Sequence, residues 1–542
     1  MGDVKDVIVV GAGVSGLAAA QTAQRAGLTV AVVEARDRIG GRLYSLNCGS
    51  LTNIIENESN AISMGSNADI YVEAGANWVH NMSKSNVIYR IATKLGLQMC
   101  QMYSSEVEID PLTIIADRSI DGDHRLFSAD EIRQAALCYE ELMEETWKVY
   151  RKLRKGRAST RNTISLAEGL ERGMRRLESK RFISESVRQL VAWRVEMECL
   201  SNAEDVDGLS LCAWISGEEE DLHGEGLVSG GLSQILPELS EGLHITLQCP
   251  VTDIYWDNRH SPPSPSCPMR VVTGQGDFLA WNVIVTAPLG CIQARSILFH
   301  PPLPTATQAA IDSLHVGLLA VVVLRFEHVF WPQGGAGAFG VPPSAGNTWR
   351  DTPHQEGCER YPDDDLFYSF VPLSDTRPDR CPLLLGYVAG RRARQLESMS
   401  DWEVASCAHL SLRLIFGEGV ALPPIGVAFH RWGADPYSRG SYSTLCVGTT
   451  REAKAVMAAP MYASAACVSG GEGRDGSDKG GDGVDDGVGS GGVRTPCPFS
   501  ACSLQLAGEA TEFDLVGLLQ GAHASGVRAA KNIIKNIIKN TK

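Results

Sequence analysis

The glycine-rich segment at residues 6–42 constrains the fold more than any other part of the chain. It reads DVIVVGAGVSGLAAAQTAQRAGLTVAVVEARDRIGGR. The wholly apolar run at 7–10 predicts a strand buried on both faces, and the Ala-rich run at 17–26, which Gly27 ends, predicts a helix. A second β-branched run at 29–33 ends at Glu34. Strand, glycines, helix, strand and acid in this order predict a βαβ unit that binds a dinucleotide.

The residues of this unit fit the phosphates and ribose of such a ligand. Gly11 makes the tight turn, Gly13 lets the backbone approach a pyrophosphate, and Gly16 allows close packing of helix on strand. Ser15 lies in the same turn, where the free N–H groups of the helix face the phosphates. Glu34 is placed to accept hydrogen bonds from a ribose diol, which disfavours a ligand with a 2′-phosphate.

Length and composition narrow the class of protein. At 542 residues the chain is too long for one small core, and two domains are expected. No apolar run approaches the length of a membrane span, and the first strand starts so close to Met1 that we expect neither a signal nor a transit peptide. The 15 cysteines are scattered without paired spacing, which indicates reduced thiols in an intracellular, cytoplasmic protein and predicts no metal site.

The charge balance bears on the partners of the chain. A formal net charge of −15 argues against nucleic acid and suits a cationic small molecule as substrate. Simple solubility explains the same charge, and charge alone does not separate the two interpretations.

Several further motifs follow in the order found in one enzyme family. Arg42 comes directly after two glycines downstream of Glu34. The later motifs are YVEAGANWVH at 71–80, NVIVTAPLG at 282–290, WGADPYSRGSYS at 432–443 and LQLAGEAT at 504–511. This series resembles the flavin amine oxidases, most closely the polyamine oxidases of plants and algae, and favours FAD over NAD. The resemblance covers almost the whole chain outside residues 47–69 and a Gly- and Asp-rich stretch at 468–493, which we expect to be a disordered insertion.

The resemblance implies an α/β fold with an α+β second domain. A discontinuous, Rossmann-like FAD-binding domain would comprise residues 1–83, 225–297 and 433–542. A smaller sheet-and-helix substrate-binding domain would comprise residues 84–224 and 298–432. The positions that the resemblance and the glycine-rich turn place around FAD are Gly11, Gly13, Ser15, Gly16, Glu34, Arg36, Arg42, Gly75, Ala76, Asn77, Trp78, Val251, Thr286, Trp432, Gly508, Glu509 and Leu519.

The same resemblance implies residues on the substrate side of the flavin. His80 would lie beside the flavin ring and Tyr442 would form one side of an aromatic cage. A carboxylate facing the substrate channel is expected from the helical region that contains Glu198 and Glu196, and Glu198 is the first candidate. Besides Ala320, which stands for an Asn, and Gln520, which stands for a His, two positions depart from the family pattern. Val321 stands where a water-holding Lys is expected, and Leu518 replaces a residue that is often aromatic.

The implied chemistry is oxidation of a C–N bond in a spermine- or spermidine-like polyamine. A hydride passes to flavin N5, water hydrolyses the imine, and O2 reoxidises FAD with release of H2O2. Val321 and Leu518 leave open a different amine or amino-acid oxidase, a dehydrogenase, or an FAD-bound scaffold or sensor with little catalysis.

Two related activities and several kinds of partner are disfavoured. No extra histone-engaging domain or long helical insertion is visible, which argues against a histone demethylase. Cys is absent from 512–516 and no terminal membrane helix is visible, which argues against a monoamine oxidase. We expect a monomer that acts on a small cationic amine with O2, without membrane or nucleic acid.

Overall fold

The computed structural model describes eleven stretches of the chain. They are residues 3–48, 70–103, 114–117, 125–154, 163–217, 224–256, 268–333, 338–344, 361–373, 381–463 and 502–541. The predicted insertion at 468–493 lies outside the described residues. Within the described part, no helix combines the length and apolar character needed to cross a membrane.

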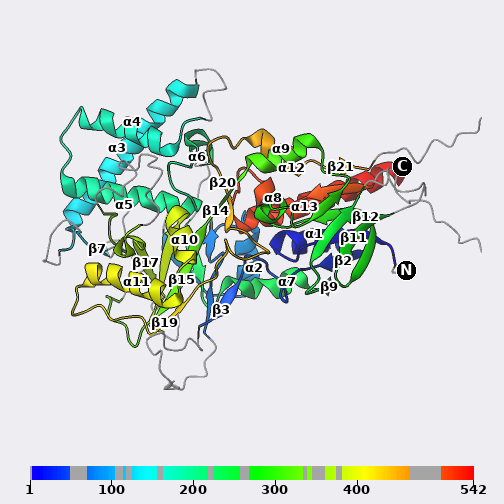
Figure 1. Ribbon diagram of the computed structural model, residues 1–542, viewed down its shortest axis with the longest axis horizontal. Helices are drawn as coiled ribbons and strands as arrows, with labels where there is room; N and C mark the ends of the chain where they lie inside the picture. Colours follow the sequence, from blue (N-terminus) through cyan, green and yellow to red (C-terminus); the bar gives the residue numbers. More distant parts are fainter. Residues whose placement is uncertain are drawn as a thin grey trace, which may run out of the picture.

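A nine-stranded sheet forms one end of the molecule, on the right in Figure 1 near both termini. Its centre is parallel: β12 pairs with β1, β1 with β2, and β2 with β9, while β22 pairs with the last residues of β12. The strands are β1 (Lys5–Val10), β2 (Val30–Val33), β9 (Ile245–Thr246), β10 (Val251–Tyr255), β11 (Met269–Thr273), β12 (Gly276–Val285), β13 (Leu298–His300), β21 (Met461–Tyr462) and β22 (Ser503–Leu506).

Both faces of this sheet are covered, as the apolar run of β1 predicts. Val7 and Val9 point into a core shared with helices α1 (Val14–Arg25) and α13 (Leu519–Thr541), and Ile8 and Val10 point into a second core on the other face. The second face is covered in part by α8 (Leu289–Gln293), α9 (Thr305–Ser313) and α12 (Arg451–Ala458). A strand buried on both faces cannot tolerate polar side chains, which is why the run is wholly apolar. The parallel centre and helical layers confirm the predicted α/β class.

A second sheet and a group of helices form the other end, on the left in Figure 1. The strand order is β19 (Gly426–Ala428), β15 (Leu319–Arg325), β18 (Leu383–Ala389), β17 (Ser369–Pro372), β16 (Phe339–Gly340) and β7 (Ile114–Ile115). Helices α10 (Gly390–Glu397) and α11 (Asp401–Phe416) share a core with this sheet. Helices α3 (Ala129–Arg154), α4 (Leu166–Glu178), α5 (Glu185–Asn202) and α6 (Leu211–Gly217) build a separate core.

Short strands and turns join the two ends. A three-stranded sheet has the order β5 (Trp78–His80), β8 (Glu225–Val228) and β6 (Met99–Tyr103). Two further strand pairs are β3 (Ser45–Asn47) with β4 (Tyr71–Glu73), and β14 (His315–Gly317) with β20 (Tyr442–Thr444). Helices α2 (Val87–Lys94) and α7 (Leu236–Ser240) and the 3-10 turns η2 (Leu232–Ile235), η4 (Asp363–Asp365) and η5 (Glu509–Thr511) complete the described elements.

We propose the predicted two-domain division with one change. The predicted boundary after residue 297 falls directly before β13, yet β13 pairs with β10 in the nine-stranded sheet. The chain therefore stays with this sheet through β13, and α9 then packs on a face of the same sheet. The chain next joins the second sheet at β15.

Candidate active site

One elongated cavity of about 1200 Å³ connects the glycine-rich turn with the helical end of the molecule. Pockets for drug-sized ligands measure about 300–1,000 Å³, so this volume accommodates a large ligand together with a small one. Of the residues predicted around FAD, all except Gly16 line the cavity. A Cβ on Gly16 would lie 1.9 Å from the carbonyl oxygen of Gly11, so this glycine serves helix–strand packing, as the sequence predicts.

The acid at the end of β2 is oriented by backbone donors. Glu34 is buried, and its Oε2 accepts a hydrogen bond from the Ala12 amide at 2.6 Å while Oε1 accepts one from the Arg36 amide at 2.9 Å. Arg36 forms an ion pair with Asp435 at 2.8 Å. The carboxylate therefore lies in a fixed position against the glycine-rich turn, where a ribose hydroxyl would meet it.

The bare backbone at Gly508 offers the most direct test of whether a cofactor fits here. Gly508 lines the cavity at a φ of +127°, and a Cβ built on it would meet no atom within 4 Å. The residue thus presents backbone to open cavity space rather than to packed protein. With the amide-rich turn at Gly11 and Gly13, this geometry fits the close backbone approach that a dinucleotide requires.

A buried charged network supports the wall next to Gly508. Arg42 forms an ion pair with Glu509 at 2.9 Å, and Glu509 Oε2 also accepts a hydrogen bond from the Ser443 hydroxyl at 2.6 Å. Burial opposes ionisation of Glu509, but the charges of Arg42 and Lys454 outweigh it and lower the pKa of this carboxyl. Lys454, which the sequence analysis missed, is buried and its ammonium donates to Ser443 Oγ at 3.3 Å. Burial lowers the pKa of Lys454 to about 8.

His80 meets a carboxylate that sequence reasoning did not identify. The antiparallel pairing of β5 and β8 places His80 directly opposite Glu225, and His80 Nδ1 lies 2.6 Å from Glu225 Oε1. Both residues line the cavity. Burial of Glu225 opposes ionisation, but the hydrogen bond and charge of His80 outweigh it and lower the pKa of Glu225. The pair can orient the imidazole and hold a proton at the cavity wall.

The two candidate carboxylates of α5 have different environments. Glu198 lines the cavity, where its Oε1 accepts from the Tyr139 hydroxyl at 2.8 Å and its Oε2 from the Trp214 indole at 3.2 Å. Glu196 does not line the cavity. It is buried in an ion pair with Arg392 at 3.1 Å, and burial raises its pKa to about 7 despite that partner. Glu198 is therefore the carboxylate available to a ligand.

Aromatic and apolar side chains also line the cavity. Tyr442 packs against Gly517, where a Cβ would lie 2.7 Å from the Tyr442 ring, and its hydroxyl donates to the carbonyls of Leu200 and Ser201. Burial raises the pKa of Tyr442. Val321 and Leu518 also line the cavity. Both departures from the family pattern thus face the space where a substrate would lie.

The fold and the cavity define a protein that binds a dinucleotide beside a chamber for a second, smaller molecule. Comparison with known proteins identifies the class more closely. A family model described as "Flavin containing amine oxidoreductase" matches residues 14–534. The chain belongs to this family, and FAD is accordingly its cofactor. The predicted family and the predicted cofactor are both confirmed.

The relatives that match the chain include proteins named as polyamine oxidases and proteins named as histone demethylase homologues. It is 27% identical over 538 residues to Polyamine oxidase 2 of Arabidopsis thaliana, a match that covers 98% of this chain and 89% of the relative. It is 28% identical over 500 residues to Lysine-specific histone demethylase 1 homolog 3 of the same plant, covering 85% of this chain but only 28% of that relative. A solved structure of putrescine oxidase bound to putrescine aligns with a TM-score of 0.65 at 18% identity, over 98% of this chain and 99% of the other, which shows the shared fold.

Proposed function

We propose that this chain is a polyamine oxidase, which oxidises a C–N bond of a spermine- or spermidine-like substrate with O2 as the final electron acceptor. One observation carries the proposal: a carboxylate suited to an ammonium group, Glu198, faces the same cavity as the backbone cradle at Gly13 and Gly508. The match to Polyamine oxidase 2 along 89% of that relative supports it.

Glu198 would hold a charged nitrogen away from the reacting carbon. Its two oxygens already accept hydrogen bonds from Tyr139 and Trp214, so the carboxylate is oriented before a ligand arrives. A hydrogen bond between ionised partners is roughly twice as strong as a neutral one. The Tyr442 ring offers the cation an aromatic face in the same chamber.

The reacting nitrogen must be neutral, because its lone pair drives hydride loss from the neighbouring carbon. Free alkylamines titrate near ~10.4, so the site has to favour the deprotonated form. The apolar walls at Val321 and Leu518 disfavour the ammonium, and the His80–Glu225 pair is positioned to take up its proton. When bound, FAD supplies the acceptor for the hydride, and O2 takes up the two electrons as H2O2.

A second candidate is demethylation of a methylated lysine side chain, which is also the oxidation of an amine. The matches to histone demethylase homologues favour it, with identities of 28% and 30% in two plant proteins. The chain spans only 28% and 52% of those two proteins. Either activity would use the same FAD site and differ in what the Glu198 end of the cavity admits.

A substrate panel separates these candidates. The purified FAD-loaded protein would be incubated in air with spermine, spermidine, putrescine, N-acetylspermine and a dimethyl-lysine histone peptide, with H2O2 release and products measured. Shorter amines and an aldehyde with equivalent H2O2 are expected from spermine or spermidine. Formaldehyde from the peptide alone would replace the proposal with the demethylase. No product from any polyamine would reject it.

A further inference from the structure

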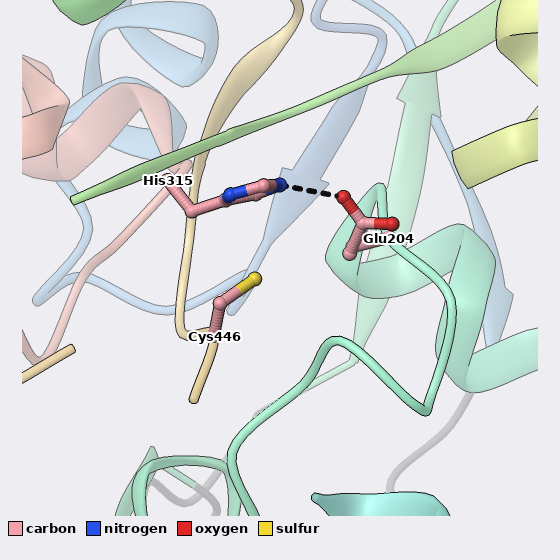
Figure 2. A group of neighbouring side chains, drawn as sticks. All are labelled: Glu204, His315 and Cys446. Carbon is pink, nitrogen blue, oxygen red and sulfur yellow. Dashed lines mark hydrogen bonds and ion pairs between the residues drawn. The ribbon is translucent and has the colours of Figure 1, made fainter. Parts of the chain in front are cut away.

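A cluster of three different metal-ligating side chains lies outside the cavity (Figure 2). Glu204 Oε2 and His315 Nε2 are 2.8 Å apart, and the ligand atoms of Glu204, His315 and Cys446 all lie within 4.8 Å of one another. Figure 2 shows the Cys446 sulfur directed toward the space beneath the hydrogen bond between the other two. None of the three side chains lines the cavity described above.

The backbone holds these three ligands together before any ion binds. Glu204 follows the end of α5, His315 begins β14, and Cys446 follows β20 by two residues. His315 pairs with Thr444 where β14 and β20 run side by side. The backbone of Cys446 forms an isolated antiparallel β-bridge with that of Leu209. The Leu318 amide donates a hydrogen bond to the Ala203 carbonyl at 2.7 Å. Each of the three segments is therefore hydrogen-bonded to another, so the ligand positions are set by the fold.

The environments of Glu204 and His315 suit metal ligands. Glu204 Oε1 is already engaged by Arg394 at 2.9 Å and by the Asp205 amide at 3.0 Å, which leaves Oε2 as the oxygen directed at the cluster. Ligating carboxylates are characteristically held in this way by outer hydrogen bonds. Cys446 and Glu204 are buried, whereas the His315 side chain is 48% exposed and opens a route from solvent.

We propose that Glu204, His315 and Cys446 form a zinc-binding site with three protein ligands. One thiolate, one imidazole and one carboxylate are the ligand types that Zn²⁺ accepts together, and a water entering beside His315 would complete four-coordination. On binding, the Cys446 S–H bond breaks, the sulfur donates to Zn²⁺ and the proton leaves to solvent. The hydrogen bond between Glu204 Oε2 and His315 Nε2 also breaks: its proton moves to Nδ1 of His315 or leaves to solvent, so that Nε2 and Oε2 can each donate a lone pair to Zn²⁺.

Zinc bound at this site would stabilise the contact between Tyr442 and the end of α5. The Tyr442 hydroxyl donates to the carbonyls of Leu200 and Ser201 at the end of α5, only three residues before Glu204. Zn²⁺ would tie that end of α5 to the segment after β20, and so fix both sides of this contact. No local sequence motif reveals this site, because its three ligands, at positions 204, 315 and 446, are far apart in the sequence.

Zinc retention by the full, FAD-loaded protein tests the proposal. The protein would be stripped with a chelator, incubated with Zn²⁺, desalted and analysed for metal content, and the retained zinc examined by X-ray absorption. We expect about one zinc per chain with one sulfur at about 2.3 Å. We expect C446S and H315N to weaken zinc binding at least tenfold in competition with a chromogenic chelator.

The matched control is C138S, at a buried cysteine of α3 outside the cluster, which should bind zinc as the wild type does. Flavin absorbance and the metal-free melting temperature verify that each variant is folded. Absence of bound zinc in the wild type would overturn the proposal. A zinc shell without sulfur, or equal retention by the folded C446S and H315N variants, would overturn it as well.

Discussion

Val321 and Tyr387 lie directly opposite each other on the antiparallel strands β15 and β18, and both line the cavity. Directly opposed residues project from the same face of a sheet. The Tyr387 hydroxyl accepts a hydrogen bond from Asn77 Nδ2 at 2.8 Å. An apolar residue thus stands where the family resemblance places a Lys, and a phenol held by Asn77 lies across from it.

Tyr387→Phe tests whether this phenol contributes polar chemistry that Val321 cannot. The substitution removes the hydroxyl and leaves Asn77 Nδ2 without this acceptor. We expect the rate of flavin reduction by spermine to fall about tenfold, equivalent to about 1.4 kcal/mol. Tyr255→Phe, on β10 of the nine-stranded sheet, is the control. Equal reduction rates in Y387F and wild type would contradict a role for the phenol.

Val321→Lys tests whether the absence of a Lys at this position limits the reaction. If the missing ammonium limits turnover, V321K should raise the rate of flavin reduction about 100-fold or more, the contribution of a positioned proton-transfer group. Val321→Met extends the side chain without a charge and is the matched control. A gain in V321M as large as that in V321K would show that side-chain length, and not the amine, is responsible.

Glu198→Gln should weaken substrate binding more than chemistry. The amide keeps the shape of the carboxylate but loses the charge that would face a distal ammonium. We expect KM for spermine to rise about 10–100-fold while kcat stays within about threefold, the pattern of a contact made equally in ground and transition states. Glu171→Gln, in the exposed pair with Arg175 on α4, is the control. A fall in kcat at unchanged KM would place Glu198 at the reacting nitrogen instead.

Gly508→Ala should prevent binding of FAD while the protein still folds. A Cβ there would protrude into open cavity space at a φ of +127°. Gly27→Ala is a matched control, because Gly27 has a φ of +85° and likewise no atom within 4 Å of its Cβ position, but it lies outside the cavity. Each substitution carries a backbone strain of about 1–2 kcal/mol. We expect G27A to purify yellow and G508A colourless, by flavin absorbance per chain; equal flavin content would refute the assignment of Gly508.

The acid dependence of stability should report on Glu204. Burial opposes ionisation, but the hydrogen bond from His315 and the charge of Arg394 lower its pKa to about 2. The unfolded value is about 4.3, so the folded chain binds fewer protons between these values. The stabilisation is therefore complete above about pH 4.5 and disappears as the pH falls toward 2.

Melting of wild type and Glu204→Gln in chelator measures this dependence. The melting temperatures should differ at pH 6–7 by the equivalent of about 2–3 kcal/mol, and the difference should shrink steadily below about pH 4.5. Glu171→Gln should change the melting temperature little at any pH, because its ion pair is exposed. A Glu204→Gln difference that stays constant down to pH 3 would contradict the lowered pKa.

Local patterns were sufficient to predict the α/β class and the βαβ unit that opens the nine-stranded sheet. The strand β1, the turn at Gly11 and the helix α1 are contiguous, so spacing alone specifies them. We propose a boundary later than residue 297 because β13 pairs with β10 in this sheet, which a local apolar pattern does not reveal.

The substrate side depends on contacts between distant segments, and there the sequence was less informative. Glu225 is recognisable only from its register opposite His80, 145 residues away. Glu196 and Glu198 are two residues apart on one helix and so point in different directions, but only tertiary packing shows which of them reaches the cavity. Lys454 belongs to the site through its contact with Ser443, which no motif indicates.

Anaerobic mixing of the purified yellow protein with spermine or spermidine tests the central claim most directly. If the cavity binds FAD and presents a polyamine to it, the absorbance of oxidised flavin should be lost in a single turnover and return when O2 is admitted. Flavin that remains oxidised with every polyamine would contradict the account.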